Sequence, residues 1–122
     1  MQHRVKGRIL SRRTGQRHAL LKTMLGSLIM RERITTTEAK AKELKNHIDQ
    51  LINKGKRAAA ADKAKRQAVL RDLRIRLSVE ATQKISGEFA KRFETRKSGY
   101  VRVVKLDARK GDGAKMAVIE FV

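Results

Sequence analysis

The sequence lacks cysteine and proline entirely, and it has few acidic residues. Without cysteine the chain cannot form disulfide bonds, thiolate zinc sites or a cysteine nucleophile. No apolar run approaches the roughly 20 residues that a helix needs to span a bilayer. Against 31 Lys and Arg there are only 12 Asp and Glu, which gives a formal net charge of +19. Because such a charge destabilises an isolated compact protein by self-repulsion, the composition predicts an anionic partner, most commonly a nucleic acid.

Residues that could support catalysis or bind a metal are also few. His3, His18 and His47 lie far apart, and no two of them have metal-binding spacing on one helical face. Gly111 and Gly113 lack the further residues that complete a nucleotide-binding glycine loop, so we interpret them as turn glycines. Asp and Glu mostly adjoin Lys or Arg, which favours surface ion pairs over a catalytic carboxylate pair. We therefore expect no enzymatic activity and no cofactor or metal.

The first 18 residues form a basic segment without any acidic residue. Its apolar residues Val5, Ile9 and Leu10 follow neither helical nor strand spacing, and two glycines interrupt it. We therefore predict an extended basic arm over residues 1–15 that orders when a polyanion neutralises it. The composition also resembles that of a transit peptide, although the segment lacks the amphipathic stripe of one.

The middle of the chain, residues 16–93, is predicted to be mainly helical. From Gln16 to Arg33 apolar residues recur at i, i+4 and i+8, which indicates an amphipathic helix. A second helix is expected to follow, with its cap at Thr35 or at Thr37. Its outward face is expected to carry four charged residues: Lys40, Lys42, Glu43 and Lys45.

Gly55 is predicted to end that second helix, because glycine is common at the left-handed position that follows a helix. Two further helices are expected, from about Ala61 to Arg71 and from about Ser78 to Arg92. The stretch from Arg71 to Leu77 alternates basic and apolar residues, so a short strand is an alternative there.

The last segment, residues 99–122, is predicted to form a β-hairpin. The strands Tyr100–Leu106 and Met116–Val122 are rich in β-branched residues, and the loop Asp107–Lys115 between them has a basic tip. Ile34–Thr36 is a candidate third strand. The chain is therefore predicted to be one α+β domain of 122 residues. In it, a basic extended N-terminal arm precedes three to four helices, which pack with a small two- to three-stranded sheet ending in the C-terminal hairpin.

Basic residues are separated from acidic ones in a way that indicates nucleic-acid binding. Glu32 is the only acidic residue in the first 33 positions, and arginine, whose planar fork matches phosphate oxygens, dominates the arm. Helix-turn-helix, zinc-finger and basic-zipper patterns are absent. Phe89 and Phe93 have core spacing, and Tyr100 is interpreted as a core residue, with a stacking contact as the alternative. Without a stacking platform, the protein is predicted to recognise the backbone and shape of a nucleic acid.

A set of short segments can be compared with known families. In chain order they are His3-Arg4 with Gly7-Arg8 and Leu10; Arg17-His-Ala-Leu-Leu-Lys22; Glu32-Arg-Ile-Thr-Thr36; Ala39-Lys-Ala-Lys-Glu-Leu44; Ser98-Gly-Tyr-Val-Arg102 with Lys105; Arg109-Lys-Gly-Asp112; Met116-Ala117; and Ile119-Glu120. No single segment is diagnostic, but the ordered set resembles the family of bacterial large-subunit ribosomal protein number seventeen.

The resemblance implies a structural constituent of the large ribosomal subunit, in the cytoplasm, that binds and stabilises folded large-subunit ribosomal RNA and so supports translation. It also implies that the N-terminal arm penetrates the RNA near the peptide exit region. Large-subunit ribosomal proteins numbered twenty-two and thirty-two are expected neighbours, while no membrane and no small-molecule substrate are expected. With the charge distribution, it predicts RNA contacts at His3, Arg4, Lys6, Gly7, Arg8, Arg12, Arg13, Arg17, His18, Lys22, Arg33, Lys42, Arg96, Lys97, Arg102, Lys105, Arg109 and Lys110.

Two other functions are compatible with the residues alone. A sequence-nonspecific DNA-packaging protein would bind duplex DNA as well as, or better than, folded ribosomal RNA. A membrane-active cationic protein would use the apolar stripe from Leu20 to Ile29, although that stripe is also the expected core of the body.

Overall fold

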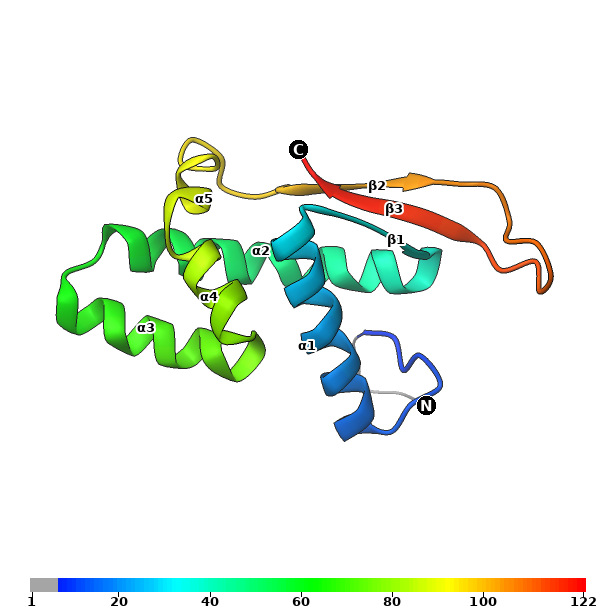
Figure 1. Cartoon of the computed structure of the whole chain (residues 1–122), viewed down its shortest axis with the longest axis horizontal. Helices are drawn as coiled ribbons and strands as arrows, with labels where there is room; N and C mark the ends of the chain where they lie inside the picture. The colour runs from blue at the N-terminus through cyan, green and yellow to red at the C-terminus, as the bar shows by residue number, and fades with distance from the viewer. Residues whose placement is uncertain (1–6) are drawn as a thin grey trace.

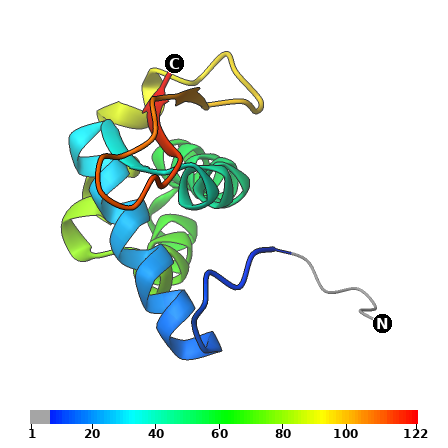
Figure 2. The ribbon, with the colours of Figure 1, turned by 90° about the vertical axis from the view of Figure 1, so that its right-hand side faces the viewer.

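In the computed structural model, which describes residues 7–122, the other helices and strands all pack against one long helix, α2 (Glu38–Ala60). The sheet lies along one side of α2, α3 lies along the other, and α1 crosses it (Figures 1 and 2). The other elements of this part of the chain are α1 (Thr14–Arg31), β1 (Arg33–Thr37), α3 (Lys63–Arg76), α4 (Val79–Ile85), the one-turn helix α5 (Glu88–Lys91), β2 (Val101–Lys105) and β3 (Met116–Phe121). The observed architecture is therefore the predicted α+β class.

The three described strands form one antiparallel sheet in the order β1-β3-β2. Ile119 of β3 stands opposite Ile34 on one side and Val103 on the other, which confirms both the C-terminal hairpin and the third strand. Because side chains alternate along a strand, Ala117, Ile119 and Phe121 share the face that packs on α2. The opposite face carries Glu120 and the charged residues beside it.

The core is built from apolar stripes at helical spacing. In α1 the residues Leu21, Leu25, Leu28 and Ile29 are buried, and in α2 Leu44, Ile48, Leu51 and Ile52 meet them and the sheet. The apolar stripe of α1 is thus part of the core, so it is not available as a membrane-binding surface. Among the described residues, no helix has the length and apolar character required to cross a membrane.

An aromatic cluster joins the C-terminal hairpin to the helices. The ring of Phe93 lies 5.3 Å from that of Phe89 and 5.3 Å from that of Tyr100, both in edge-to-face geometry. Tyr100 has no exposed surface, and its hydroxyl donates to Asn53 Oδ1 at 2.6 Å. The prediction that Phe89, Phe93 and Tyr100 are core residues is confirmed.

The prediction that Gly55 ends the second helix is wrong, because α2 continues to Ala60. Gly55 is buried in mid-helix where α4 crosses, and a Cβ there would collide with the main-chain carbonyl oxygen of Ile85. Glycine therefore stands at this position because two helices approach closely, and not because the chain turns.

Other helix boundaries also differ from the predictions. Helix α1 begins two residues early, at Thr14, and ends at Arg31, where Glu32 adopts a left-handed φ of 64°. Helix α3 extends to Arg76, so the alternative of a short strand from Arg71 to Leu77 is wrong. Asp62 caps α3 by accepting a hydrogen bond from Lys65 N, a start signal that the predicted boundaries missed.

The helix predicted from Ser78 to Arg92 is two helices, α4 and α5. The Ser86 hydroxyl donates to Thr82 O, and Gly87 then breaks the helical path before α5 begins. At the start of α2, Thr37 is the N-cap residue, although its side chain makes no capping hydrogen bond. Thr35, the alternative cap, instead pairs with Val118 in the sheet.

Candidate nucleic-acid interface

The described part of the basic N-terminal segment, residues 7–13, is anchored to α2 by a carboxylate. The backbone N–H of Arg8 and its Nη1 each donate to Glu43 Oε2 at 3.2 Å. Gly7 has a φ of +90°, and a Cβ on it would stand 3.0 Å from Glu43 Oε1. A glycine at position 7 thus lets the backbone pass directly over this carboxylate. Its role in this structure is to allow that approach.

Glu43 is buried, with a relative exposure of 3%, so the prediction that it lies on the outward face of α2 is wrong. Its Oε1 lies 3.2 Å from His47 Nε2, one helical turn away. Burial raises the pKa of Glu43, but hydrogen bonds from His47 and Arg8 outweigh it, so the pKa is lowered overall. A carboxylate that stays ionised therefore fixes the position of the basic segment.

Between Arg8 and α1 the chain makes a tight turn. Leu10 and Ser11 have φ angles of 56° and 55°, in the left-handed region that costs energy for residues with a Cβ. The turn is held by Arg12, whose N–H donates to Ile9 O at 3.2 Å and whose Nη1 donates to Leu10 O at 2.7 Å. An extended conformation through residue 15 was therefore a wrong prediction. His3, Arg4 and Lys6 lie outside the described residues.

The start of α1 is basic and has no electrostatic compensation from its own first turn. Arg13 occupies the N-cap position without a side-chain capping bond, and the first turn contains no acidic residue. Arg17, His18 and Lys22 follow on the helix, and His18 and Lys22 are exposed. Cations at a helix N-terminus oppose the helix dipole, so Arg13 and Arg17 are better explained by an anionic partner than by helix stability.

Arg33 of β1 and Arg102 of β2 flank Glu120 of the central strand β3 on the outer face of the sheet, because both stand opposite Glu120 in the strand register. Arg33 Nε lies 3.4 Å from Glu120 Oε2, and Arg102 Nε lies 2.8 Å from Oε1. One carboxylate thus holds two mostly exposed guanidinium groups. The group keeps a net positive charge, with the guanidinium forks at a fixed spacing.

Lys42 and Lys105 share a second carboxylate, that of Glu38. Their Nζ atoms lie 2.8 Å and 3.8 Å from Glu38 Oε1. The hydrogen bond from Lys42 holds the pKa of Glu38 below its ordinary value. Lys105 is the more exposed of the two lysines, with 71% side-chain exposure, and it leads into the hairpin loop.

The hairpin tip is ordered by an internal ion pair. Arg109 Nε and Nη2 donate to the two carboxylate oxygens of Asp112 at 3.1 Å and 2.6 Å, and Ala114 N donates to the same carboxylate. The guanidinium lowers the pKa of Asp112 to about 2. Arg109 therefore shapes the loop, while Lys110 projects from it and is exposed.

The turn that carries Arg96 and Lys97 is tied to α2. Gly99 N and Tyr100 N donate to the carboxylate of Asp49 at 3.2 Å and 3.4 Å. The carbonyl oxygen of Arg96 lies 3.1 Å from Tyr100 OH, and Arg96 Nη1 donates to Gly99 O at 3.3 Å. Both predicted side chains are exposed on a loop whose backbone is held in place.

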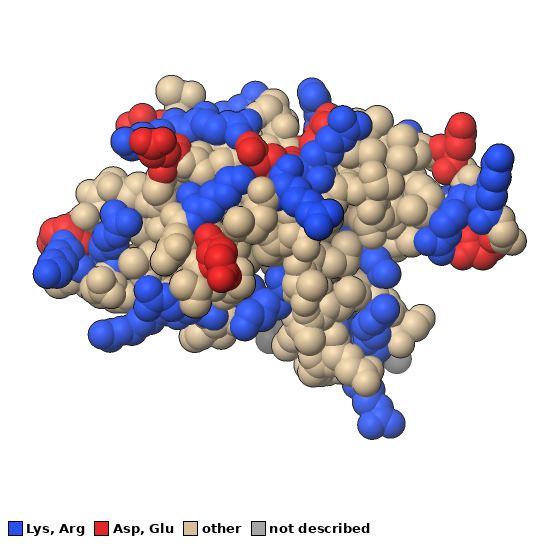
Figure 3. All heavy atoms as spheres, viewed as in Figure 1, with Lys and Arg blue, Asp and Glu red and all other residues tan. Residues whose placement is uncertain are grey.

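The predicted residues within the described range do not form one patch. They lie in three separate regions: residues 7–22, the sheet with its hairpin tip and the adjacent Lys42 of α2, and the 94–99 turn beyond α5 (Figure 1). Figure 3 shows Lys and Arg over several edges of the molecule, with acidic residues interspersed. This arrangement suits contact with several separate stretches of a polyanion.

Helix α3 carries a basic surface that the predicted set does not include. Six of its residues are Lys or Arg, and Asp72 is its only acidic residue and pairs with Lys54. The six are Lys63, Lys65, Arg66, Arg71, Arg74 and Arg76. A count of acidic against basic residues in this window would have found them.

Two features that often mark a catalytic or metal centre are absent from the described residues. Across residues 7–122 no group of three or more His, Cys, Asp or Glu side chains could hold a metal ion. Every buried side-chain nitrogen or oxygen in that range has a hydrogen-bond partner. The carboxylates of Glu38, Glu43, Asp112 and Glu120 are each engaged by Arg, Lys or His, which is the arrangement of structural ion pairs.

Comparison with known proteins gives a consistent set of relatives. The family described as Ribosomal protein L17 matches residues 20–122. The large ribosomal subunit protein bL17 of Staphylococcus carnosus (strain TM300) is 44% identical over 119 residues, which cover 94% of this chain and 98% of the relative. That of Anaeromyxobacter sp. (strain K) is also 44% identical, over 122 residues that cover 100% of this chain and 73% of the relative. The chain therefore belongs to the ribosomal protein L17 family.

Proposed function

We propose that this chain is a structural, non-enzymatic constituent of the large ribosomal subunit that binds and stabilises folded large-subunit ribosomal RNA. The observation that carries the proposal is membership of the L17 family over nearly the whole chain, since the relatives are large-subunit ribosomal proteins by name. The formal charge of +19 supplies the attraction to RNA. Its place of action is accordingly the ribosome, in the cytoplasm.

The three basic regions divide the RNA contacts between them. The N-terminal segment would enter the RNA from its anchor at Glu43, bringing Arg8, Arg12 and Arg13 to phosphates. The remaining predicted contacts would dock the body through α1, the sheet with its hairpin tip and the 94–99 turn, and α3 adds a further basic face. Because each region is held by its own ion pairs or hydrogen bonds, little side-chain and loop entropy is lost on binding.

The protein neighbours expected from the family are the large-subunit ribosomal proteins numbered twenty-two and thirty-two. This part of the proposal rests on the family resemblance alone. Chemical crosslinking of intact large subunits, read out by mass spectrometry, tests it directly. Crosslinks from Lys97 or Lys110 to other proteins only would contradict it.

The experiment for the main proposal is sedimentation of a cell lysate through a sucrose gradient, at moderate and then at high salt. We expect the chain to travel with the large subunit and to resist the high-salt wash. Retention at the top of the gradient, or release after DNase treatment, would contradict the proposal and favour DNA packaging.

A charge-reversal pair then tests the assigned surface. Arg13→Glu should weaken binding to large-subunit ribosomal RNA. It should also reduce the slope of log affinity against log salt concentration by the contribution of roughly one phosphate contact. Lys45→Glu makes the same charge change on an exposed position of α2 outside the predicted set, so it is the matched control. Equal losses in the two variants would show that net charge matters and the assigned surface does not.

A further inference from the structure

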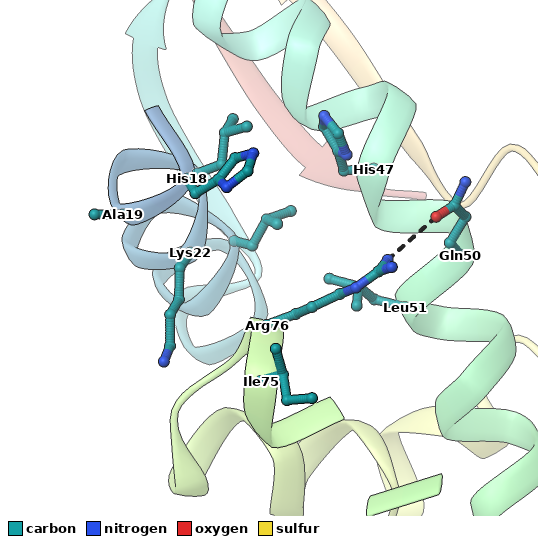
Figure 4. Close-up of a pocket in the computed structure, with 10 residues that line it drawn as sticks. His18, Ala19, Lys22, His47, Gln50, Leu51, Ile75 and Arg76 are labelled. Atoms are coloured by element: carbon teal, nitrogen blue, oxygen red, sulfur yellow. Dashed lines mark hydrogen bonds between the residues drawn. The ribbon is translucent and has the colours of Figure 1, made fainter. Parts of the chain in front are cut away.

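A groove of about 550 Å³ lies between α1, α2 and the C-terminal end of α3. The buried part of its lining consists of the core residues Leu21, Leu25 and Leu51, which we call the floor. Ile75 of α3 lines it as well (Figure 4). Ile75 is 74% exposed, the largest value among the exposed large apolar residues of the described chain. We refer to this feature as the α1–α2–α3 groove.

The rim of the α1–α2–α3 groove carries flat, cationic or titratable side chains. His18 and His47 approach it from α1 and α2, and Arg76 reaches across from α3 to donate to Gln50 Oε1 at 3.3 Å (Figure 4). Lys22 lies at the α1 edge. None of the lining residues in the described range is acidic. The groove therefore combines an apolar floor with a rim that attracts anions.

Imidazole rings and guanidinium planes are the side chains, besides larger aromatic rings, on which unstacked RNA bases pack. The sequence holds only three Phe and one Tyr, and those with core positions cannot serve this purpose. The structure nevertheless brings together three planar groups, His18, His47 and Arg76, that lie far apart in the sequence. All three line the groove, a juxtaposition that no local sequence pattern reveals.

We propose that the α1–α2–α3 groove binds one unpaired nucleotide extruded from the bound RNA. The base lies on the leucine floor beside the imidazole and guanidinium planes, Gln50 offers its amide to the base edge, and Lys22 faces the phosphate. This proposal rests on the proposed function, because it assumes that RNA is the partner. The protein is otherwise expected to contact the RNA backbone, and the groove would add one site that contacts a base.

Charge complementarity favours a nucleotide over the apolar side chain of a neighbouring protein. A protein segment that filled only the floor would leave the surrounding cations without counter-charges in a partly desolvated site, which is costly. A nucleotide supplies an apolar base face and a phosphate at once. The His47 ring is also oriented by Glu43, at 3.2 Å, so this part of the rim is preorganised.

The direct test is an NMR titration of the full chain with adenosine 5′-monophosphate and, separately, with ribose 5-phosphate. We expect adenosine 5′-monophosphate to shift resonances of His18, His47 and Ile75. Ribose 5-phosphate should bind there about 5- to 150-fold more weakly, the range that stacking of one base accounts for. Equal affinity of the two compounds, or shifts confined to other surfaces, would overturn the proposal.

Two matched pairs of variants extend the test. Ile75→Ser removes an apolar side chain that lines the groove, and Val79→Ser changes an apolar residue that is 53% exposed outside the groove. Arg76→Gln removes a planar cation from the groove, and Arg74→Gln removes an exposed cation outside it. Only the groove variants should reduce the preference for adenosine 5′-monophosphate over ribose 5-phosphate. An equal reduction in both members of each pair would overturn the proposal.

Binding to large-subunit ribosomal RNA separates this proposal from the proposed function. Ile75→Ser should weaken that binding about fivefold without changing its salt slope, since no charge is removed. If the unaltered chain fails to bind the RNA, the proposed function fails. If the unaltered chain binds the RNA and the Ile75→Ser and Val79→Ser variants bind it with equal affinity, only the groove proposal fails. A protein partner then becomes the better occupant of the groove.

Discussion

At the scale of single residues, Glu43 controls where the basic N-terminal segment leaves the body. Its carboxylate is 3% exposed, yet it accepts hydrogen bonds from Arg8 and lies 3.2 Å from His47. Because an unpaired buried charge is costly, a carboxylate at this position needs a partner. That partner, Arg8, lies 35 positions earlier in the chain and has no sequence signal of its own.

We predict that Glu43→Gln lowers the free energy of unfolding by about 1 kcal/mol. The neutral amide keeps one acceptor but loses the charge-assisted hydrogen bonds, and the 42% exposure of the Arg8 side chain limits the cost. Urea denaturation measures the change, and amide hydrogen exchange at Arg8 should accelerate. Glu38→Gln is the control, since it removes a carboxylate from α2 without touching Arg8. Unchanged exchange at Arg8 in Glu43→Gln would contradict the anchoring role.

Acid should remove the contribution that the Glu43 carboxylate makes to the free energy of unfolding. Because the pKa of Glu43 is lowered in the folded state, its stabilisation is complete above the unfolded-state pKa of about 4.3. The stabilisation is lost as the pH falls through the lower, folded-state pKa. The difference in unfolding free energy between the unaltered chain and Glu43→Gln should therefore be constant near pH 7 and shrink toward zero below pH 4. A difference that grows on acidification would show that the pKa shift has the opposite sign.

At the scale of elements, the contact between α2 and α4 depends on a glycine. A Cβ at Gly55 would meet the carbonyl oxygen of Ile85, which belongs to a helix and cannot turn aside as a side chain could. We predict that Gly55→Ala lowers the free energy of unfolding by about 1–3 kcal/mol, despite the better helix propensity of alanine.

Gly15→Ala is the matched control for this prediction. Gly15 lies in α1, and nothing lies within 4 Å of a Cβ placed there. The same substitution should therefore raise the free energy of unfolding by about 0.5–1 kcal/mol through helix propensity alone. Thermal denaturation of both variants measures the effect, and we expect Gly55→Ala to lower the Tm and Gly15→Ala to raise it. Shifts of the same sign would mean that α2 and α4 move apart at little cost.

The hairpin tip offers a second test at this scale. Arg109 should be needed to keep the pKa of Asp112 at about 2. In Arg109→Gln that pKa should rise toward the ordinary value of about 3.9, with some lowering retained from the Ala114 N–H. An NMR titration of the Asp112 carboxyl carbon measures it, and Lys110→Gln, a charge change at the next residue, is the control. Equal rises in both variants would show a general charge effect.

These elements also show how far the sequence alone could go. Apolar spacing predicted the core stripes of α1 and α2, and the β-branched runs predicted the hairpin, because those signals are local. The end of α2 was not predictable, because glycine is required at position 55 by the close approach of Ile85, which is 30 positions away in the chain. The division between α4 and α5 depends on the Ser86 hydroxyl and the Gly87 backbone. The apolar spacing that continues through Phe89 predicts one uninterrupted helix, so it hides this break.

At the scale of the whole molecule, the sequence predicted the chemical type of the partner better than it predicted which residues form the interface. Charge counts indicated an anionic partner and selected the arm and the hairpin, but they could not show that Arg109 is engaged by Asp112 within its own loop. Nor could they reveal the groove around Arg76, whose members come from three helices. Such sites follow from tertiary packing, so they are visible only once the fold is known.

The charge of the whole chain also governs the stability of the free protein. With 31 basic and 12 acidic residues, long-range repulsion exceeds the gain from the ion pairs, which are mostly exposed and individually worth little. Screening should reduce the repulsion more than it weakens the pairs. We therefore predict that raising KCl from 20 to 300 mM stabilises the free chain by about 1 kcal/mol, or about 4 °C in Tm, while it weakens RNA binding.

Thermal denaturation across the KCl series measures this effect. Neutralising two exposed lysines of α3 in the double variant Lys63→Gln/Lys65→Gln should raise the Tm at low salt and reduce the gain on adding KCl. Both residues also lie in the first turn of α3, where cations oppose the helix dipole, so their removal acts in the same direction. If the Tm instead falls with KCl, the ion pairs at Glu120, Glu38 and Glu43 outweigh the net charge. The free chain would then be stable without its polyanion at low ionic strength.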